Sequence, residues 1–159
     1  MTAPPRRPAK MTAPAGFAQR VRESFGRQAA MATLGARLGA IDAGRVELLM
    51  THRAELTQQH GFLHAGIVAA ALDSACGYAA FTLMPDDAAV LTIEFKINLL
   101  APARGPRLRF EGVVVKHGRT ISVVDGRALQ GDADGAHELL VATMTATVMT
   151  VRGREALRH

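Results

Sequence analysis

The segment 65–84 constrains this chain most, because it is almost continuously apolar and rich in alanine. Alanine favours helices over strands, so the segment predicts one long buried helix. Its length approaches that of a membrane span, but Asp73 lies near its middle, alanine and glycine dominate it, and no second such segment follows. We therefore expect a helix at the centre of a globular domain and no membrane partner.

Asp73 is the anomaly of this helix, because a buried carboxylate loses its hydration unless it reaches water, a partner or a ligand. Residues three and four apart share one helix face. On the face of Asp73 these residues are very small: Gly66, Ala69, Ala70, Gly77 and Ala80. Either a neighbouring backbone or a substrate can lie against such a face. A third interpretation places Asp73 on a thin solvated stripe with Ser74.

The N-terminus of the same helix is a second candidate feature. His64-Ala65-Gly66 begins the helix, and the first backbone N–H groups of a helix have no partner within it. Such groups can polarise a carbonyl oxygen that gains negative charge in a transition state. His64 either orients that oxygen or the preceding loop, or it simply caps the helix.

The spacing of these two features predicts a site that two chains share. His64 and Asp73 are nine residues apart, which places them about half a turn apart in direction and roughly 13 Å apart along the helix axis. One copy of the helix cannot direct both groups toward one bond. Two helices side by side can do so, if the N-terminus of one meets the carboxylate of the other.

The residues before this helix predict a surface helix and a hairpin. Residues 17–34 carry apolar side chains at a helical spacing among polar ones. Residues 37–41 and 45–50 predict two strands around the tight turn 42–44, which reads Asp-Ala-Gly. Residues 52–63 show no sustained period and predict a loop.

Four strands are predicted after the helix. Residues 91–99 alternate between apolar and polar, which is typical of a half-buried strand. The residues expected on its apolar face are Leu91, Ile93, Phe95, Ile97 and Leu99. Further strands are expected over 108–116, from about Thr120 onward, and over 139–151. The order predicts an α+β domain, in which an antiparallel sheet wraps the central helix and a second subunit supplies the remaining cover.

Three short motifs lie at specific distances along the chain. Residues 58–66 read Gln-Gln-His-Gly-Phe-Leu-His-Ala-Gly and are followed by Asp73. Residues 90–103 read Val-Leu-Thr-Ile-Glu-Phe-Lys-Ile-Asn-Leu-Leu-Ala-Pro-Ala, and residues 118–120 read Gly-Arg-Thr. Over about 25–149 the chain thus resembles hotdog-fold acyl-CoA thioesterases of the PaaI type. The resemblance implies a long central helix wrapped by a curved antiparallel sheet, and hydrolysis of acyl-CoA thioesters to free acid and CoA.

The resemblance also implies a role for each motif residue. Asp73 acts as general base or nucleophile toward the thioester, across an interface between two subunits. The backbone N–H of Ala65 polarises the carbonyl, and His64 and Gly66 shape that turn. Gln58 positions the substrate or the attacking water. The assembly is a homodimer with shared active sites, or a dimer of such dimers.

Two residues depart from the family pattern. Ala65 replaces the first glycine of the usual pair, which puts a methyl group beside the pocket and can change the preference for the acyl group. Gly77 stands where some relatives carry a hydroxyl that helps to hold water. An apolar tunnel for an aliphatic or aryl acyl group is expected from four residues: Phe62, Leu63, Phe81 and Met84. The identity of that group stays open.

The CoA part of the substrate carries phosphate charges, which fits an excess of 19 Lys and Arg over 14 Asp and Glu. A phosphate grip is expected at Lys116, Arg119 and Thr120, with Arg104 and Arg107 in the preceding turn. The expected substrate-binding residues are Gly66, Gly77, Asn98, Lys116, Gly118, Arg119 and Thr120.

The ends of the chain and its single cysteine bear on location. We expect a disordered basic arm over 1–16, the thioesterase domain over 17–151 and a frayed tail over 152–159. Met-Thr-Ala-Pro occurs at 1–4 and again at 11–14, so either methionine can be the start. Cys76 is the only cysteine and the arm lacks a secretory signal, which predicts a cytoplasmic protein.

Other functions are weighed against this one. A non-catalytic hotdog protein that binds acyl-CoA is the main alternative, although the retained Asp73 and Gln58 argue against it. Nucleic-acid binding is not expected, because aromatic residues make up 4% of the chain and tryptophan is absent. His60 and His64 are four residues apart but lack a third ligand, so we expect neither a metal nor another cofactor.

Overall fold

The computed structural model describes residues 11–133 and 137–153. Along the chain the elements are α1 (Phe17–Gly26), α2 (Ala29–Leu34), β1 (Arg37–Asp42), β2 (Arg45–Thr51), a short 3₁₀ helix (Ala54–Leu56), α3 (Ala65–Phe81), β3 (Ala89–Leu99), β4 (Arg107–His117), β5 (Ile121–Gly131) and β6 (Glu138–Val151).

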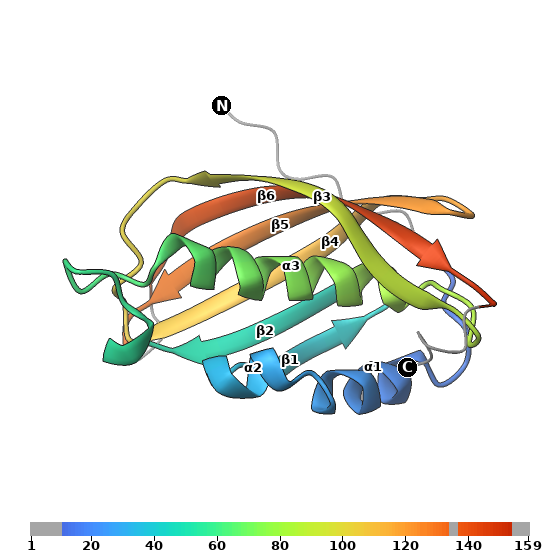
Figure 1. The fold of residues 1–159 in the computed structure, drawn as a ribbon, viewed down its shortest axis with the longest axis horizontal. Coiled ribbons are helices and arrows are strands. Elements are labelled where there is room, and N and C mark those ends of the chain that lie inside the picture. The colour runs from blue at the N-terminus through green and yellow to red at the C-terminus, as the bar shows by residue number, and fades with distance from the viewer. Residues whose placement is uncertain (1–10, 134–136, 154–159) are drawn as a thin grey trace.

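The strands form one six-stranded antiparallel sheet in the order β1-β2-β4-β5-β6-β3. The sheet curves around α3, which lies along its concave face, while α1 and α2 lie beside the β1 edge (Figure 1). The β1–β2 hairpin turns at Ala43 and Gly44, as the sequence predicts, with Gly44 at a φ of 78°. This arrangement confirms the predicted α+β architecture of a long helix wrapped by a curved antiparallel sheet.

Two glycines let α3 lie directly on the sheet. Gly112 of β4 and Gly126 of β5 are cross-strand partners. A Cβ atom added at Gly112 would overlap the carbonyl group of Ala75, and one added at Gly126 would lie 2.9 Å from the Sγ of Cys76. The middle of α3 therefore packs directly against the backbone of β4 and β5. This contact fixes the distance between the helix and the sheet.

Gly112→Ala should destabilise the fold, because neither the α3 backbone nor the central strand can move aside locally. We expect the free energy of unfolding to fall by about 1–3 kcal/mol, which is typical of overpacking in a core. Urea unfolding followed by circular dichroism measures the effect. Gly26→Ala is the matched control, since an added Cβ there meets nothing within 4 Å. Equal stability of the two variants would contradict this account of the contact.

The prediction of one helix over 17–34 is wrong, because the chain breaks at Arg27 and Gln28 into α1 and α2. Val21 and Leu34 are both buried, yet 13 positions along one straight helix would turn them roughly 140° apart. The break allows both side chains to reach the core. Gln28 leaves the helical region at φ −82° and ψ 89°.

The central helix ends at Phe81, three residues before the predicted end at Met84. Arg20 of α1 accounts for part of this difference, since its guanidinium donates hydrogen bonds to the carbonyls of Phe81 (2.9 Å) and Met84 (2.6 Å). Thr82 donates to the Ala79 carbonyl at 2.6 Å and accepts from the Gly44 amide at 2.8 Å. These bonds satisfy the end of α3 without a further helical turn.

The expected faces of β3 are confirmed after Ile93, where Phe95, Ile97 and Leu99 share the inner face, but they are wrong before it. The strand has an irregular register between Thr92 and Glu94, so the residues before and after Ile93 do not alternate as one series. Thr92 lies opposite the buried Val148, and Phe95 lies opposite the buried Ala146. Directly paired residues share a face, so these two point toward α3, whereas Leu91 points away. A period of two in the sequence cannot show such an irregularity.

The termini are described in part. Met11 and Ala13, within the predicted arm 1–16, are partly buried against the core. Residues 1–10 of that arm and 154–159 of the predicted tail lie outside the described residues. None of the helices described has both the length and the apolar character that crossing a membrane requires.

Candidate functional site

Backbone hydrogen bonds hold the loop before α3 in place and with it the N-terminus of this helix. The Leu63 amide donates to the Ala103 carbonyl at 2.8 Å, and the His64 amide donates to the Leu56 carbonyl at 2.9 Å. Gly61 turns the loop at a φ of 82°, and the backbone N–H of Gln58 donates a hydrogen bond to the Phe62 carbonyl at 2.8 Å. The start of α3 is thus fixed on both sides.

His64 is the N-cap of α3. Its backbone is extended at φ −60° and ψ 138°, and its Nδ1 accepts a hydrogen bond from the Gly66 amide at 2.9 Å. A neutral histidine that accepts at Nδ1 carries its proton at Nε2. The capping interpretation is therefore confirmed. The Ala65 amide, in contrast, donates to no acceptor among the described residues.

We expect His64→Ala to lower the free energy of unfolding by about 1 kcal/mol through loss of this cap. His64→Asn should keep most of that stability, because asparagine is a strong N-cap residue but lacks the ring nitrogen Nε2. Thermal melts of the three proteins measure the difference. Equal melting temperatures for the alanine and asparagine variants would mean that the cap contributes nothing.

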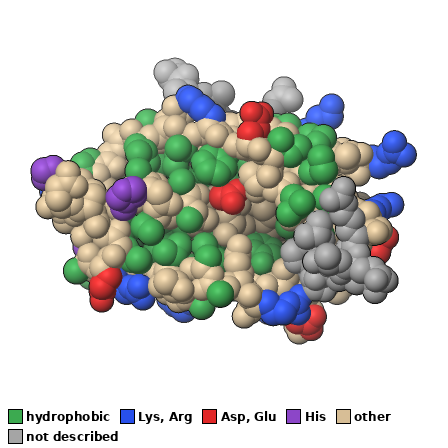
Figure 2. All heavy atoms as spheres, in the orientation of Figure 1, with side chains coloured by type: hydrophobic (Ala, Val, Ile, Leu, Met, Phe, Trp, Pro, Cys, Tyr) green, Lys and Arg blue, Asp and Glu red, His purple; other side chains and the backbone are tan. Residues whose placement is uncertain are grey.

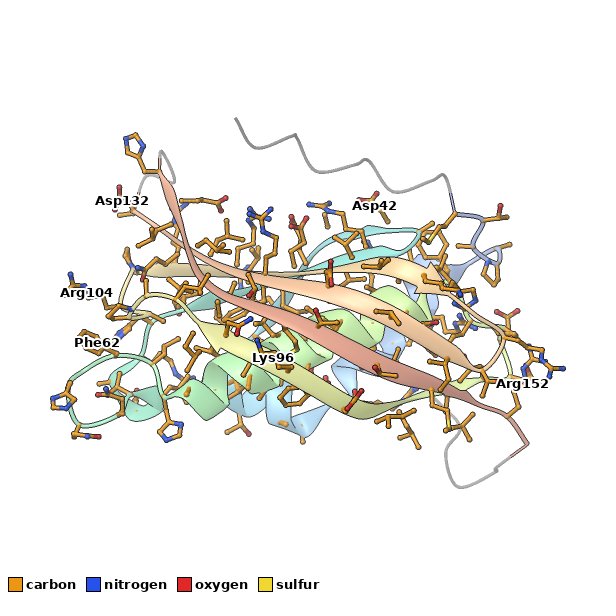
Figure 3. The ribbon with its side chains drawn as sticks, turned by 90° about the horizontal axis from the view of Figure 1, so that it is seen from above. Asp42, Phe62, Lys96, Arg104, Asp132 and Arg152 are labelled. Atoms are coloured by element: carbon orange, nitrogen blue, oxygen red, sulfur yellow. The ribbon has the colours of Figure 1, made fainter. Side chains whose placement is uncertain are left out.

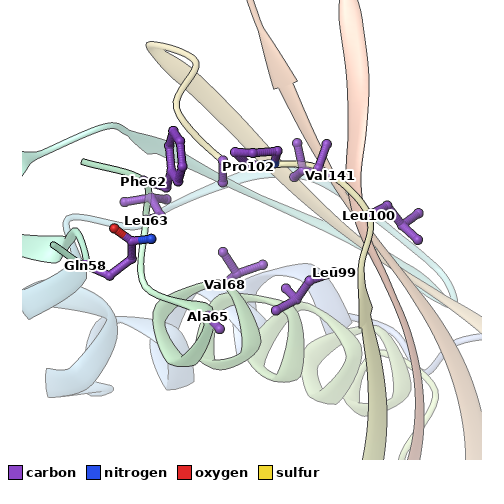
Figure 4. Close-up of a pocket in the computed structure, with 11 residues that line it drawn as sticks. Gln58, Phe62, Leu63, Ala65, Val68, Leu99, Leu100, Pro102 and Val141 are labelled. Carbon is purple, nitrogen blue, oxygen red and sulfur yellow. The ribbon is translucent and has the colours of Figure 1, made fainter. Parts of the chain in front are cut away.

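A cavity of about 350 Å³ opens beside the start of α3. Gln58 lies on one side of the cavity and Leu100 and Val141 lie on the other, with Ala65 at the start of α3 between Gln58 and Leu99 (Figure 4). The Gln58 side-chain oxygen accepts a hydrogen bond from the His60 amide. This bond leaves the amide nitrogen of Gln58 turned toward the cavity as a donor (Figure 4). The cavity therefore has a polar end with N–H donors and an apolar remainder.

Asp73 lies in the middle of α3, half-buried, with its side chain toward β3. Thr92 donates a hydrogen bond to Asp73 Oδ1 at 2.7 Å. Burial raises the pKa of the Asp73 carboxyl, and the Thr92 hydroxyl opposes that rise in part. A carboxylate held with a raised pKa is a good proton acceptor at neutral pH.

Gly77, one helical turn beyond Asp73, is buried, yet a Cβ added to it would meet nothing within 4 Å among the described atoms. Space therefore exists beside the carboxylate at the position where the resemblance expects a hydroxyl in some relatives. Cys76 is fully buried next to Gly126, and burial raises the pKa of its thiol far above the ordinary value. A thiol of this kind is inert as a nucleophile.

The structure brings Gln58, His64, Ala65 and Gly66 together but leaves Asp73 apart from them. Asp73 lies eight positions after Ala65 in α3, which is about 12 Å along the axis. Asp73 does not line the cavity. The two groups of predicted site residues therefore lie apart within one chain, at the separation that their spacing along a helix predicts.

The predicted substrate-binding residues are widely separated. Lys116 lies near the end of β4, and Gly118, Arg119 and Thr120 lie in the β4–β5 turn, whereas Arg104 lies before β4 and Arg107 is the first residue of that strand rather than part of the preceding turn. The 11 residues of β4 put about 33 Å between these groups, so they cannot form one grip within a chain. Figure 3 shows Arg104 beside Phe62 at the far end of the molecule from Arg152, with the guanidinium 5.9 Å from the ring centre.

Asn98 lies on the outer face of the sheet. Its partner in β6 is Thr143, to which its side chain donates at 3.3 Å, while the neighbouring pairs of Ile97 and Leu99 face α3. Within one chain Asn98 therefore does not reach the cavity. Phe81 and Met84, two of the residues expected in an apolar tunnel, are fully buried in the core at the other end of α3.

An open stripe follows α3 from its N-terminus to Asp73. Ala65 and Gly66 are exposed and Ala69 and Ala70 are half-buried, whereas every residue from 74 to 81 is buried. β3 beside it exposes large apolar side chains, with Phe95 42%, Ile93 52% and Leu99 53% accessible. Figure 2 shows this face, where hydrophobic side chains border a hollow with an acidic side chain in it.

Sequence reasoning missed Thr92 as the partner of Asp73, and it missed Leu99, Leu100 and Val141 as lining of the cavity. No local signal marks these residues, because their roles depend on how β3 crosses α3. Among the described residues, no three His, Cys, Asp or Glu side chains are grouped in a way that could hold a metal ion.

Comparisons with known proteins agree with this geometry. A model of the Thioesterase superfamily matches residues 60–136, which include α3 with Asp73 and the strands β3, β4 and β5. A crystal structure of a thioesterase family protein from Silicibacter pomeroyi is 59% identical, with a TM-score of 0.84, and the match covers 87% of this chain and 100% of that one.

Two further comparisons are more distant. A protein of Saccharolobus solfataricus with a provisional esterase name is 36% identical over 95 residues, which is 60% of this chain and 66% of that protein. The PaaI protein of E. coli, from the phenylacetic acid degradation operon, is 20% identical. Its TM-score is 0.77, with 89% of this chain and 98% of that chain covered. Because the identity is low, this similarity shows the fold alone.

Proposed function

The chain belongs to the thioesterase superfamily, and from this premise we propose that it hydrolyses acyl-CoA thioesters to the free acid and CoA. The observation that carries the proposal is the pair of half-sites on α3. One is the free Ala65 amide beside the cavity and Gln58, and the other is Asp73 with its raised pKa. Each supplies what the other lacks for acyl transfer.

The two half-sites meet in a dimer with β3 at its interface. β3 is an edge strand of 11 residues with exposed apolar side chains, and such an edge is a template for pairing with another strand. A two-fold axis beside it places two α3 stripes of small residues face to face and runs them antiparallel. The N-terminus of one α3 then approaches the partner's Asp73.

The reaction uses both chains at once. The thioester oxygen accepts a hydrogen bond from the Ala65 amide, which stabilises the negative charge that grows on this oxygen. In one route the partner's Asp73 takes a proton from the attacking water, the C–S bond breaks, and the proton passes to the sulfur of CoA, which leaves as the thiol. In the other route Asp73 attacks the carbonyl carbon, the C–S bond breaks to give a mixed anhydride, and a water then hydrolyses the anhydride to the free acid and the Asp73 carboxylate while its proton goes to the sulfur of CoA. The Gln58 amide donates to the substrate or to the water.

The same two-fold arrangement gives the β4–β5 turn a role. Leu91 of β3 pairs with Met149, which pairs with Ile121, so this turn lies near the start of β3. Antiparallel pairing of two β3 edges brings that end next to the partner's Leu99 and its cavity. Lys116 and Arg119 of one subunit would then bind the phosphates of a substrate whose acyl group lies in the other.

A thiol-release assay over acyl-CoAs of graded length, with phenylacetyl- and benzoyl-CoA, tests the function. We expect steady turnover with at least one substrate, and sedimentation should show no activity in the monomer fraction. No turnover of any substrate would overturn the proposal in favour of an acyl-CoA-binding protein.

Thr92→Val should shift the pH dependence of the reaction. Asp73 must lose its proton to act, so the rate rises with pH through the pKa of its carboxyl. The Thr92 hydroxyl lowers that pKa, and its removal should therefore move the acidic limb of kcat/KM to higher pH. Thr145→Val is the control, because Thr145 donates to Asp125 at 3.3 Å on an exposed part of the same sheet. A profile unchanged by Thr92→Val would argue against Asp73 as the titrating group.

A further inference from the structure

The cavity beside Ala65 is polar at one end and apolar over the rest of its length. Apart from Gln58 at its polar end, the lining side chains are hydrocarbon, and among the described residues none is ionisable. Val68 and Val141 are 2% and 1% exposed, so these two side chains are packed into the core, whereas Leu99 and Leu100 on the β3 side are 53% and 57% exposed. Figure 4 shows Leu99, Leu100 and Val141 on the side opposite Gln58.

We infer that this cavity takes an acyl group that is hydrocarbon to its far end, and that it rejects acyl groups carrying a hydroxyl or carboxylate there. The inference rests on the proposed function, because it places the thioester carbonyl at Ala65 and Gln58. From that anchor the acyl group runs toward Leu99 and Val141, where the lining side chains are all hydrocarbon.

The polar side chains nearby do not line this cavity. The Arg104 guanidinium lies over the Phe62 ring, but Arg104 lines a separate depression of about 410 Å³ with Gln130, His137 and Glu138. Gln130 is itself occupied, since it accepts from the Arg104 and Gly105 amides at 2.8 and 2.7 Å and donates to the Pro102 carbonyl at 3.2 Å. A hydroxyl at the far end of the acyl chain would therefore lose its water without gaining a partner.

Matched pairs of substrates test this inference. At the chain length that the wild type hydrolyses fastest, kcat/KM is measured for the plain acyl-CoA, its ω-hydroxy form and its ω-carboxy form; phenylacetyl- and 4-hydroxyphenylacetyl-CoA form an aryl pair. We expect the plain form to exceed the hydroxylated one by up to about 10², the limit typical of a hydrophobic pocket. The carboxylated form should be slower still.

Two variants locate the discrimination. Leu99→Gln puts a hydrogen-bonding group into the cavity wall and should bring the two rates at least about threefold closer. Leu139→Gln is the control, because Leu139 is equally accessible, at 55% against 53%, but lines the other depression. It should leave the ratio unchanged. Circular dichroism confirms that both variants are folded.

The outcomes separate the two proposals. Turnover of plain and hydroxylated substrates at equal rates overturns this inference and leaves the thioesterase function standing. A ratio that both glutamine variants alter equally also overturns it. Absence of turnover with every thioester overturns the function and this inference together.

Discussion

Asp73→Asn lowers kcat for thioester hydrolysis by about 10² to 10⁴, the range typical of removing a positioned base. Asparagine has nearly the same shape and keeps an oxygen that can accept the hydrogen bond from Thr92. What it loses is the ability to take a proton or to attack the carbonyl. Steady-state kinetics should show the loss in kcat, with little change in KM, because the groups that bind the substrate remain.

The stability of Asp73→Asn separates loss of function from loss of fold. Because the pKa of Asp73 is raised, ionisation of this group costs stability at every pH above the pKa of an unfolded aspartate, up to and beyond its folded value. The asparagine variant has no such cost, so at neutral pH it should melt no lower than the wild type. Asp86→Asn is the control, since Asp86 is 78% accessible and pairs with Arg20 far from the cavity. Normal kcat in Asp73→Asn would remove the carboxylate from the mechanism.

Much of the geometry of this candidate site could be predicted because its parts are local in sequence. A helix N-terminus, its cap and a carboxylate nine residues later are all fixed by helical geometry. Distances along one helix therefore showed that a single chain cannot bring His64 and Asp73 together, and the structure leaves the two halves apart in the same way. The β1–β2 hairpin was predictable for a similar reason, since Gly44 adopts the positive φ that its turn requires.

Features that depend on contacts distant in sequence could not be predicted. The irregular register at Ile93 reverses the predicted faces of β3 for the residues before it, and only the pairing with β6 shows it. Thr92 contacts Asp73 because of this reversal, although the alternating pattern assigned Thr92 to the polar face. The break between α1 and α2 likewise depends on where Val21 and Leu34 meet the core.

Ala65→Pro should lower kcat by about 10² to 10³, the effect typical of losing one donor to a developing oxyanion. Ala65 is the first residue of α3, where proline is favoured because that N–H has no partner within the helix. His64, with φ −60° and ψ 138°, already has the extended backbone that a following proline requires. The variant thus removes the proposed catalytic N–H and leaves the helix in place. Ala65→Val is the control, since valine adds as many side-chain carbons and keeps the N–H.

Mixing the two inactive variants tests whether the site is shared. In a dimer of one Ala65→Pro chain and one Asp73→Asn chain, one site contains both defects and the other contains the intact Ala65 and the intact Asp73. Random exchange at equal amounts makes half of the dimers mixed, and each has one working site of two, so about a quarter of the wild-type rate should return. If each chain instead used its own Ala65 and Asp73, every site in the mixture would carry a defect. The rate would then stay at the average of the two variants, and α3 would have to bend to join groups that the structure holds about 12 Å apart.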